Sequence, residues 1–476
     1  MKQHKWLILA LLAAVQFMVV LDNSIVNVAL PVLKTALHFS QDTLQWIIVA
    51  YTLSFGGFLL LGGRAADLFG RRRVLMTGMA GFTIISLLIG LLHAPQFMIA
   101  LRSLQGLAAA FMSPAALSIV LNTFTSAKDR AVALGVWSSV GAGGAAAGLL
   151  IGGLLTQYLG WEWNFFINVP VGILVLAGLS KYVPAHMSQA REKNLDIPGA
   201  LLVTSGLVAL VFGLSEAPTW GWTSLATLGT IAASIVLLGS FIWNESRAKR
   251  PLMPLSIFRI RNITGANLAM MPVAASLYGM FFLISLYVET ILHYTPVATG
   301  LAFLPVPIVL GATSNLVPRF IGKIGFKPLL LVGTGLLAIG MFMLSFITSD
   351  SNYFTAVLPG LLLMAVGVGM NFVAINVSAT AGVPANEAGL ASGLIVTSQQ
   401  LGGALGLAIL LSVSTAAATS SLASGHTAAI AATYGYSRGF LMATGFAIIS
   451  FLVGAFVIKQ KAVSKTSANS EPVTVH

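Results

Sequence analysis

The sequence contains no cysteine and very little charge. Only 8% of its 476 residues are Asp, Glu, Lys or Arg, whereas 57% are hydrophobic. The lack of cysteine excludes disulfides, thiolate metal sites and a cysteine nucleophile. The low charge excludes an ordinary soluble domain, in which about a quarter of the residues are charged. The seven histidines are scattered along the chain, so we expect no bound metal and no cofactor.

Enzyme and nucleic-acid motifs are also lacking. The chain has no HExxH, no GxSxG and no phosphate-binding P-loop. The run GAGGAA (141–146) resembles a dinucleotide-binding turn, but it lies inside an apolar segment without the strand and βαβ unit that such a turn requires. We therefore expect that the protein is not an enzyme. The net charge of +12 does not indicate nucleic acid, because basic residues of membrane proteins collect in cytoplasmic loops.

Long apolar runs are present instead, and each is long enough to cross a bilayer core of about 30 Å. The sequence thus predicts an all-α polytopic membrane protein with 14 transmembrane helices. The first apolar run, after MKQHK, resembles a signal peptide, but we interpret it as an uncleaved first helix. The predicted spans are 6–30, 44–63, 74–93, 96–122, 131–157, 164–182, 198–216, 224–244, 263–288, 297–317, 328–348, 354–380, 388–413 and 437–458.

The basic residues indicate the orientation of these helices. With the N-terminus inside, 22 of the 25 Lys and Arg residues fall in inside segments. Lys34 and Arg438 fall outside, and Arg102 falls within a span. Because Lys and Arg mark cytoplasmic loops, we expect a multi-pass protein of the inner (cytoplasmic) membrane with both termini in the cytoplasm.

An internal repeat divides the chain. GRAADLFGRRRVLMTG (63–78) and PRFIGKIGFKPLLLVG (318–333) match at a constant offset, which pairs Arg64 with Arg319 and Gly70 with Gly325. Repeated halves are typical of alternating-access transporters. The predicted domains are an N-terminal six-helix bundle (1–183), an inserted helix pair with a cytoplasmic linker (184–262), a C-terminal six-helix bundle (263–460) and a disordered tail (461–476).

Two charges, Asp22 and Arg102, lie deep in predicted spans. A charge at the bilayer centre costs about 2.5–3.5 kcal/mol on insertion scales, and such residues are usually functional. We therefore predict that Asp22 and Arg102 couple proton movement to transport. A purely structural ion pair, or side chains that reach the membrane interface, is the alternative.

Polar residues within other spans are candidates for a substrate cavity. Each could equally form a packing hydrogen bond between helices, and Glu289 could be a cap at the membrane interface. Asn27 follows Asp22 by five residues and so lies on another stripe of the helix. The predicted cavity residues are Asp22, Asn27, Gln105, Glu289, Asn371, Asn376 and Gln399.

The segment GRAADLFGRRRVL predicts a conformational gate. Asp67 and Arg71 are four residues apart and could pair. Gly63 and Gly70 would permit close backbone approach, and Arg72 adds a further charge. The alternative is a short inside loop that carries Arg for topology alone. We also assign Gly144, Gly148 and Gly152 to conformational change, because small residues let helices pack closely and slide.

These segments resemble the major facilitator superfamily, and within it the fourteen-span drug:proton antiporters of the EmrB/QacA type. GRAADLFGRRRVL resembles the superfamily's cytoplasmic loop signature, and LDNSIVNVALP (21–31) resembles the span 1 signature of the antiporters. RSLQG places Arg102 where the family has an arginine linked to proton coupling. GAAAGLLIGG (144–153) resembles the span 5 antiporter motif, but Leu149 stands where that motif usually has proline.

The resemblance implies the major facilitator fold, with two six-helix bundles plus two inserted helices. It also implies proton-coupled efflux of amphipathic drugs or toxic compounds, and hence multidrug or antibiotic resistance. The expected partners are protons, a small-molecule substrate and the lipid bilayer, with no nucleic acid; we expect a monomer, and an envelope adaptor stays open. Leu149 leaves open a proton-linked transporter of a single metabolite. A channel or a membrane sensor is disfavoured, because the halves repeat and no large soluble segment exists.

Overall fold

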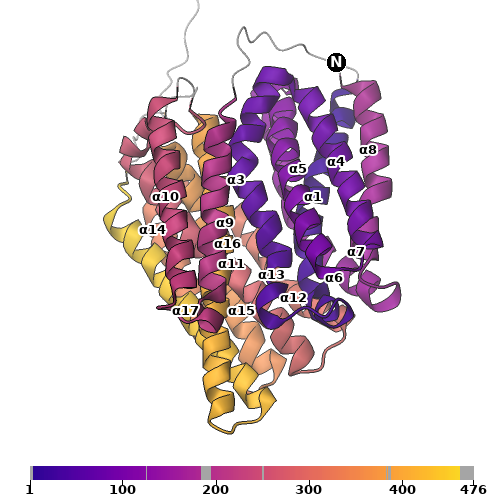
Figure 1. The fold of residues 1–476 in the computed structure, drawn as a ribbon. Coiled ribbons are helices and arrows are strands. Elements are labelled where there is room, and N and C mark those ends of the chain that lie inside the picture. Colours follow the sequence, from indigo (N-terminus) through magenta and orange to yellow (C-terminus); the bar gives the residue numbers. More distant parts are fainter. Residues whose placement is uncertain are drawn as a thin grey trace, which may run out of the picture.

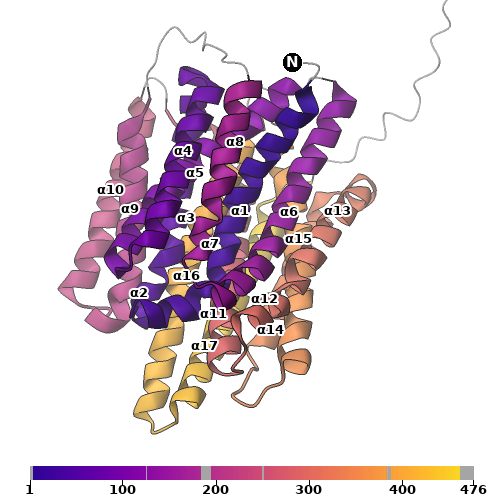
Figure 2. The same cartoon turned by 90° about the vertical axis from the view of Figure 1, so that its right-hand side faces the viewer.

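A computed structural model describes residues 4–124, 126–183, 195–248, 251–381, 383 and 388–460. These ranges are helical and contain 14 helical segments long and apolar enough to cross a membrane, which confirms the predicted number. The helices run side by side along one common direction (Figures 1 and 2). The predicted tail (461–476) and residues 184–194 of the predicted linker lie outside the described residues.

The first bundle is built around α5. Helices α3 and α4 both pack on α5, α1 packs on α6, and α8 packs on α4. The elements of this bundle are α1 (Lys5–Ala36), α2 (Gln41–Leu44), α3 (Trp46–Phe69), α4 (Arg71–Leu91), α5 (Pro95–Thr123), α6 (Ala127–Tyr158), α7 (Trp163–Phe166) and α8 (Asn168–Tyr182).

The second bundle repeats this plan. Helix α11 packs on α16 and α17, α14 packs on α15 and α17, and α13 packs on α15. Its elements are η2 (Leu255–Arg259), α11 (Arg261–Thr290), α12 (Pro296–Phe303), α13 (Pro305–Ile324), α14 (Phe326–Leu344), η3 (Tyr353–Val357), α15 (Leu358–Thr380), α16 (Ala388–Ala423) and α17 (Ala428–Phe456).

The inserted pair, α9 (Ile197–Trp220) and α10 (Leu225–Arg247), lies beside both bundles. Helix α9 packs on α10, on α3 of the first bundle and on α16 of the second. The Ser412 hydroxyl of α16 donates to the Leu214 carbonyl oxygen of α9 at 2.6 Å. Only 17% of the α10 span is buried, so α10 forms the outer face of the pair (Figure 1).

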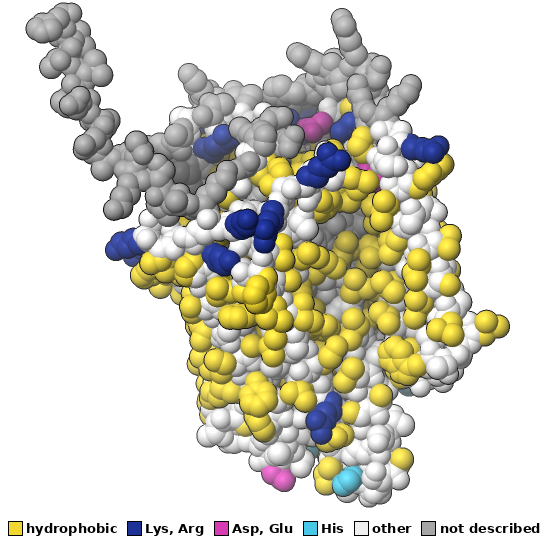
Figure 3. Space-filling view, turned by 90° about the vertical axis from the view of Figure 1, so that its left-hand side faces the viewer, with side chains coloured by type: hydrophobic (Ala, Val, Ile, Leu, Met, Phe, Trp, Pro, Cys, Tyr) yellow, Lys and Arg dark blue, Asp and Glu magenta, His cyan; other side chains and the backbone are white. Residues whose placement is uncertain are grey.

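The molecular surface has the pattern of a membrane protein. Hydrophobic side chains cover the middle of the face in Figure 3, and Lys and Arg gather towards one end. Ile235 and Val236 of α10, for example, are each 65% exposed. A contiguous apolar surface of this extent matches contact with lipid chains rather than water.

The internal repeat is visible in the backbone. Gly70 separates α3 from α4 with φ +97°, and Gly325 separates α13 from α14 with φ +82°. A side chain strongly disfavours this left-handed region, and glycine tolerates it. The two matched sequence segments therefore make the same sharp junction between consecutive helices.

The last two helices are longer than predicted. Helix α16 extends to Ala423 and α17 begins at Ala428, so the hairpin projects beyond the other helices at the end away from the N-terminus (Figures 1 and 2). The extra turns have the sequence STAAATSSLA (414–423). Alanine forms helix well although it contributes little hydrophobicity, so hydropathy alone misplaced these ends.

Candidate functional site

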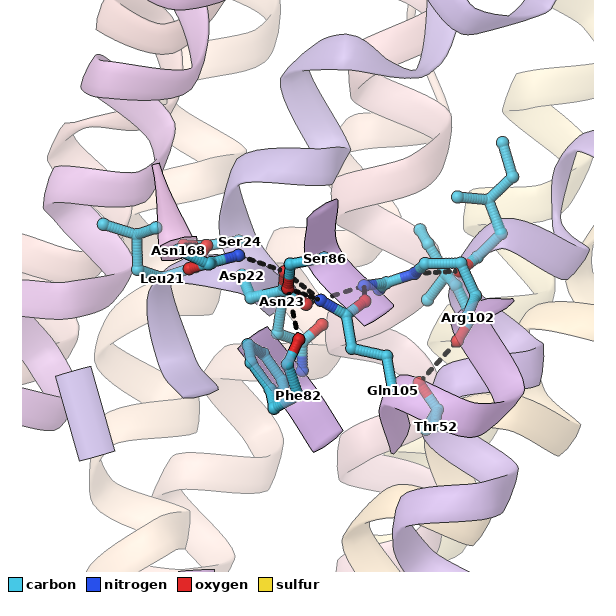
Figure 4. A network of polar contacts seen from close by, with 12 residues as sticks. Leu21, Asp22, Asn23, Ser24, Thr52, Phe82, Ser86, Arg102, Gln105 and Asn168 are labelled. Carbon is cyan, nitrogen blue, oxygen red and sulfur yellow. Dashed lines mark hydrogen bonds and ion pairs between the residues drawn. The ribbon is translucent and has the colours of Figure 1, made fainter. Parts of the chain in front are cut away.

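Asp22 and Arg102 meet inside the first bundle. The Arg102 Nη1 atom lies 2.6 Å from Asp22 Oδ2, and the two residues are 1% and 0% exposed. Asp22 comes from the middle of α1, and Arg102 comes from the first half of α5. The two predicted intramembrane charges thus form a buried ion pair (Figure 4).

Two amides complete the surroundings of the carboxylate. Gln105 Nε2 and Asn168 Nδ2 both donate to Asp22 Oδ1, at 2.8 and 2.9 Å. Gln105 Nε2 also contacts the Ser86 hydroxyl oxygen at 2.9 Å. The carboxylate therefore accepts from three side chains, on α5 and α8, while Ser86 of α4 supports one of them (Figure 4).

The guanidinium is held just as firmly. Arg102 Nε donates to the Ile47 carbonyl oxygen at 3.0 Å, and Nη1 donates to Gln105 Oε1 at 2.6 Å. The cation lies 4.4 Å from the centre of the Tyr51 ring. Gly106 makes this possible, since a Cβ there would lie 2.2 Å from the Tyr51 carbonyl oxygen. Without a side chain at this position, α3 comes close enough to contact Arg102.

A buried ion pair of this kind is costly to form and costly to break. Removing one partner leaves an uncompensated charge, which typically costs about 3–5 kcal/mol. The Asp22 carboxylate can instead accept a proton, which removes its charge and frees the guanidinium for other acceptors. Binding of one proton would therefore break the ion pair, and release of that proton would restore it. Within the described ranges, no group of three or more His, Asp or Glu residues could hold a metal ion.

The predicted glycines of α6 pack against α1 beside this site. A Cβ at Gly148 would lie 2.9 Å from the Leu21 carbonyl oxygen, and one at Gly152 would lie 3.0 Å from that of Ile25. Gly144 faces Val20 at 3.3 Å. Three successive turns of α6 thus support the turns of α1 on both sides of Asp22.

Leu149 occupies the position at which the resembling motif has proline. It is fully buried within the unbroken helix α6. A Cβ at Gly300 of α12 would lie 2.4 Å from the Leu149 carbonyl oxygen, so the second bundle touches α6 here. Leucine keeps the backbone N–H that proline would remove.

The predicted gate segment joins α3 and α4. Arg71 Nη2 lies 3.3 Å from Asp67 Oδ1, and both side chains are exposed. Arg72 donates to the Ser180 carbonyl oxygen at the end of α8, at 2.6 Å. The close helix contact is made by Gly62, whose Cβ would lie 2.1 Å from the Ala110 carbonyl oxygen. At Gly63 the nearest atom, in Pro114, is 3.7 Å away, so the predicted close approach at Gly63 was wrong by one residue.

Of the predicted cavity residues other than Asp22, the structure brings only Gln105 into contact with Asp22. Asn27 Nδ2 donates to the Asn23 carbonyl oxygen of its own helix, at 3.1 Å. The Asn27 carbonyl oxygen accepts from Ser285 of α11 at 2.6 Å, so this turn joins the two bundles. Glu289 lies beside Thr299, near the end of α11.

The remaining three lie in the second bundle. Asn371 is fully buried, and its Oδ1 lies 2.9 Å from the Cβ position of Gly333 on α14. Asn376 is exposed and bonds to the Phe372 carbonyl oxygen of its own helix at 2.7 Å. Gln399 is half-buried in α16. No hydrogen bond of the described residues joins these three to one another.

A polar contact between the bundles was not predicted. The Tyr278 hydroxyl of α11 donates to Gln400 Oε1 of α16 at 2.6 Å and receives a long contact from Asn23 Nδ2 of α1 at 3.4 Å. Asn23 follows Asp22 directly. The Tyr51 hydroxyl is buried without a hydrogen-bond partner among the described residues. The charge network and the contact with the second bundle are thus adjacent on α1.

Comparison with known proteins identifies relatives over nearly the full length. Residues 12–407 match the sequence model of the Major Facilitator Superfamily. The chain is 38% identical to the puromycin resistance protein pur8 of Streptomyces alboniger, over 98% of this chain and 93% of that protein. It is 36% identical to the cephamycin export protein CmcT of Amycolatopsis lactamdurans, over 90% and 87%. It is 37% identical to the tetracenomycin C resistance and export protein of Streptomyces glaucescens, over 86% and 76%.

Solved structures share the fold at low sequence identity. A bacterial homologue of the human lysosomal transporter Spinster, in an inward-facing conformation, superposes with a TM-score of 0.66 at 17% identity, over 96% of this chain and 98% of that chain. The POT family transporter PepTSo superposes with a TM-score of 0.69 at 15% identity, over 95% of this chain and 97% of that chain.

Proposed function

The chain belongs to the Major Facilitator Superfamily, and on that premise we propose that it exports amphipathic drugs or toxic compounds in exchange for protons. The names of its relatives support export and resistance as the outcome. The observation that carries proton coupling is the buried pair of Asp22 and Arg102. An ion pair that never changed its charge would stabilise only one conformation of the transporter. A carboxylate that can be protonated allows two conformations, one with the ion pair and one without it.

In this proposal, Asp22 takes a proton from the outer side and loses its charge. Arg102 then gives up its 2.6 Å contact with the carboxylate and is held by Ile47 and Gln105. On the inner side, proton release restores the ion pair while substrate enters. A proton moving down the membrane potential supplies about 2.3 kcal/mol per 100 mV.

Alternating access fits the contacts between α6 and the second bundle. At the end away from the N-terminus, a Cβ at Gly153 would lie 2.5 Å from the Pro296 carbonyl oxygen. Between Gly135 and Gly143, by contrast, Gly135, Gly141 and Gly143 of α6 have nothing within 4 Å of an added Cβ. We infer an arrangement closed at the outer end, in which this part of α6 makes no such close glycine contact with the second bundle. In such transporters the two bundles rock about a central site.

The same alternating-access mechanism suggests roles for the gate segment and a place for the substrate. The Asp67–Arg71 pair and the Arg72 contact with α8 would hold the inner end of the first bundle in one of the two states, and Gly144, Gly148 and Gly152 would guide α1 against α6. Substrate would lie between the bundles beside Asp22, lined by Gln105 and by residues of α11, α15 and α16. Asn27, Glu289, Asn371, Asn376 and Gln399 stay candidates there, and Tyr278 joins them.

We further propose the division into bundles at 1–183 and 263–460, with 184–262 as the inserted pair and linker. Both termini would face the cytoplasm from the inner membrane. The distribution of Lys and Arg supports this orientation. A monomer suffices, because one chain already holds both halves of the central site.

The test uses purified protein in liposomes that contain a pH-sensitive dye. A pH gradient is imposed, ethidium is added, and the wild type is compared with Asp22→Asn. Asp350→Asn, in an exposed loop, is the matched control. We expect ethidium to trigger proton movement in the wild type and the control, and to trigger none in Asp22→Asn. Full proton-coupled transport by Asp22→Asn would refute the assignment.

A transporter of one metabolite is the second candidate, and Leu149 is the observation that favours it. Its signature in the same assay is no response to any amphipathic cation, together with a response to one compound in a metabolite screen. The variant Leu149→Pro restores the residue that the antiporter motif usually has. If Leu149 narrows the substrate range, Leu149→Pro should broaden it.

A further inference from the structure

A pair of acids, one half-buried and one buried, lies in the inserted pair, far along the chain from Asp22. Asp196 precedes α9, and Glu245 lies in the last turn of α10. The start of α9 and the end of α10 lie at the end of the molecule that carries the N-terminus (Figure 1). Glu245 is only 3% exposed. Neither residue has a role in the transport cycle proposed above.

Asp196 is surrounded by hydrogen-bond donors. Its Oδ1 accepts the Gly199 backbone N–H at 2.9 Å, which caps the start of α9. The Asn244 side-chain amide donates to both carboxylate oxygens, at 3.0 and 2.9 Å. Asp196 therefore has its acceptor oxygens occupied by N–H groups, as a carboxylate requires.

Only one of the two Glu245 carboxyl oxygens has a hydrogen-bond partner among the described residues. Its Oε2 accepts the Met253 backbone N–H at 3.0 Å, while Oε1 is buried without a partner among the described residues. Oε1 and Asp196 Oδ2 lie 2.9 and 2.6 Å from the same point, the Cβ position of Gly199. The two oxygens are therefore at most 5.5 Å apart, the sum of 2.9 and 2.6 Å. Two acceptors thus face one another, and an unfilled acceptor pair in a buried position is costly.

We propose that Asp196 and Glu245 together bind one proton, and that this proton fastens segment 251–260 to the inserted helix pair. The proton lies on Glu245 Oε1, which then donates to Asp196 Oδ2, so that the pair carries one negative charge. A metal ion fits less well, because the described residues supply only two carboxylates here and Asn244 directs N–H groups at one of them. Carboxyl pairs at such separation do not both ionise readily.

No other described charge compensates this pair. Among the described residues, no Lys, Arg or His forms an ion pair with Asp196 or Glu245. Arg247 lies two residues further on, but its guanidinium stacks 4.7 Å from the centre of the Trp243 ring. Asp22 has Arg102 as its positively charged partner. In our proposal, a bound proton takes that place for Glu245.

The fastened segment connects the two bundles. Leu252 is 8% exposed and packs with Leu61 of α3 and Ala200 of α9. A few residues later, Ile257 packs in a cluster with Ala391 of α16. Since Glu245 holds the Met253 N–H, loss of the shared proton would repel Glu245 from Asp196 and release the segment at its start. Contact between the bundles at this end would thereby depend on the pH on that side of the membrane.

The lack of cysteine permits a direct test in the full chain. Leu252→Cys places one thiol in the buried contact, and Ser256→Cys places one at an exposed position of the same segment. Both are labelled with a neutral maleimide between pH 5.5 and 9. The ratio of the two labelling rates cancels the pH dependence of the thiol itself. We expect this ratio to rise by at least about tenfold with pH, as two like charges at this separation separate.

Three variants make the test decisive. In Glu245→Gln the amide donates to Asp196 as the proton does, so the ratio should stay low at every pH. In Glu245→Ala the Met253 contact is gone, so the ratio should be high at every pH. Asp350→Asn, which removes an exposed acid that has no role in either proposal, should leave the pH response unchanged. A wild-type ratio that does not change with pH, or an equal rise in Glu245→Gln, would overturn the proposal.

Discussion

Gly106→Ala tests whether close packing of α3 on α5 holds the charge network in place. The added Cβ would lie 2.2 Å from the Tyr51 carbonyl oxygen. An ordinary contact begins near 3.4 Å, so the helices must separate locally by about 1.2 Å, which is 3.4 minus 2.2. Ile47 lies one turn from Tyr51, and its 3.0 Å hydrogen bond with Arg102 would be stretched beyond hydrogen-bonding range.

The cost of this change follows from three terms. Overpacking costs about 1–3 kcal/mol, and loss of a hydrogen bond to a charged group costs about 1.5–3 kcal/mol. Replacing glycine by alanine in a helix returns roughly 0.5–1 kcal/mol. The net destabilisation is therefore about 1.5–5.5 kcal/mol.

Thermal unfolding of the purified protein, followed by tryptophan fluorescence, and the liposome assay provide the two readouts. We expect Gly106→Ala to unfold at lower temperature and to lose most proton-coupled transport. Gly141→Ala in α6, where nothing lies within 4 Å, is the matched control and should unfold no lower than wild type. If Gly106→Ala matched the wild type in both readouts, the packing argument would be refuted.

Three further substitutions test other parts of the structure. Asn168→Leu removes one donor to Asp22, worth about 1.5–3 kcal/mol, and should slow coupled transport about tenfold or more, whereas Asn122→Leu, at an exposed asparagine of α5 that bonds to its own helix, should not. Tyr278→Phe removes the hydroxyl that joins Gln400 Oε1 of the second bundle to Asn23 of the first, and we expect a lower maximal transport rate at unchanged expression; an unchanged rate would exclude a role for this polar contact between the bundles. Gly70→Ala forces a side chain into φ +97° at about 1–2 kcal/mol, and should lower the unfolding temperature measured by fluorescence.

The sequence was sufficient to predict the helices, because each long apolar run must be satisfied internally by helical hydrogen bonds. It also identified Asp22 and Arg102, since a charge in an apolar run is conspicuous. That the two charges meet is decided by how α1 and α5 are rotated and packed, and hydropathy carries no information on rotation. For the same reason, the sequence did not show that Gly62, and not Gly63, faces the neighbouring helix.

Asn168 and Ser86 escaped prediction for a different reason. A single small polar side chain in an apolar span can bond to its own helix, to a neighbour or to a ligand, and its sequence context is the same in each case. Asn168 stands at the start of a short span, in INVPVG, where an interface position is the simpler interpretation. Glu245, near the end of α10, resembles an ordinary terminal charge in the same way. Only the packing of several helices distinguishes these residues.

The matched junctions at Gly70 and Gly325 have an evolutionary consequence. They indicate that the chain arose by duplication of one ancestral unit, whose backbone joint survives in both copies. Asp67 of the first copy corresponds to Gly322 of the second, so the two joints differ in this acid. The backbone shape of this junction therefore does not depend on an acid at this position. The second half keeps the joint, although among the described residues the buried ion pair lies in the first half.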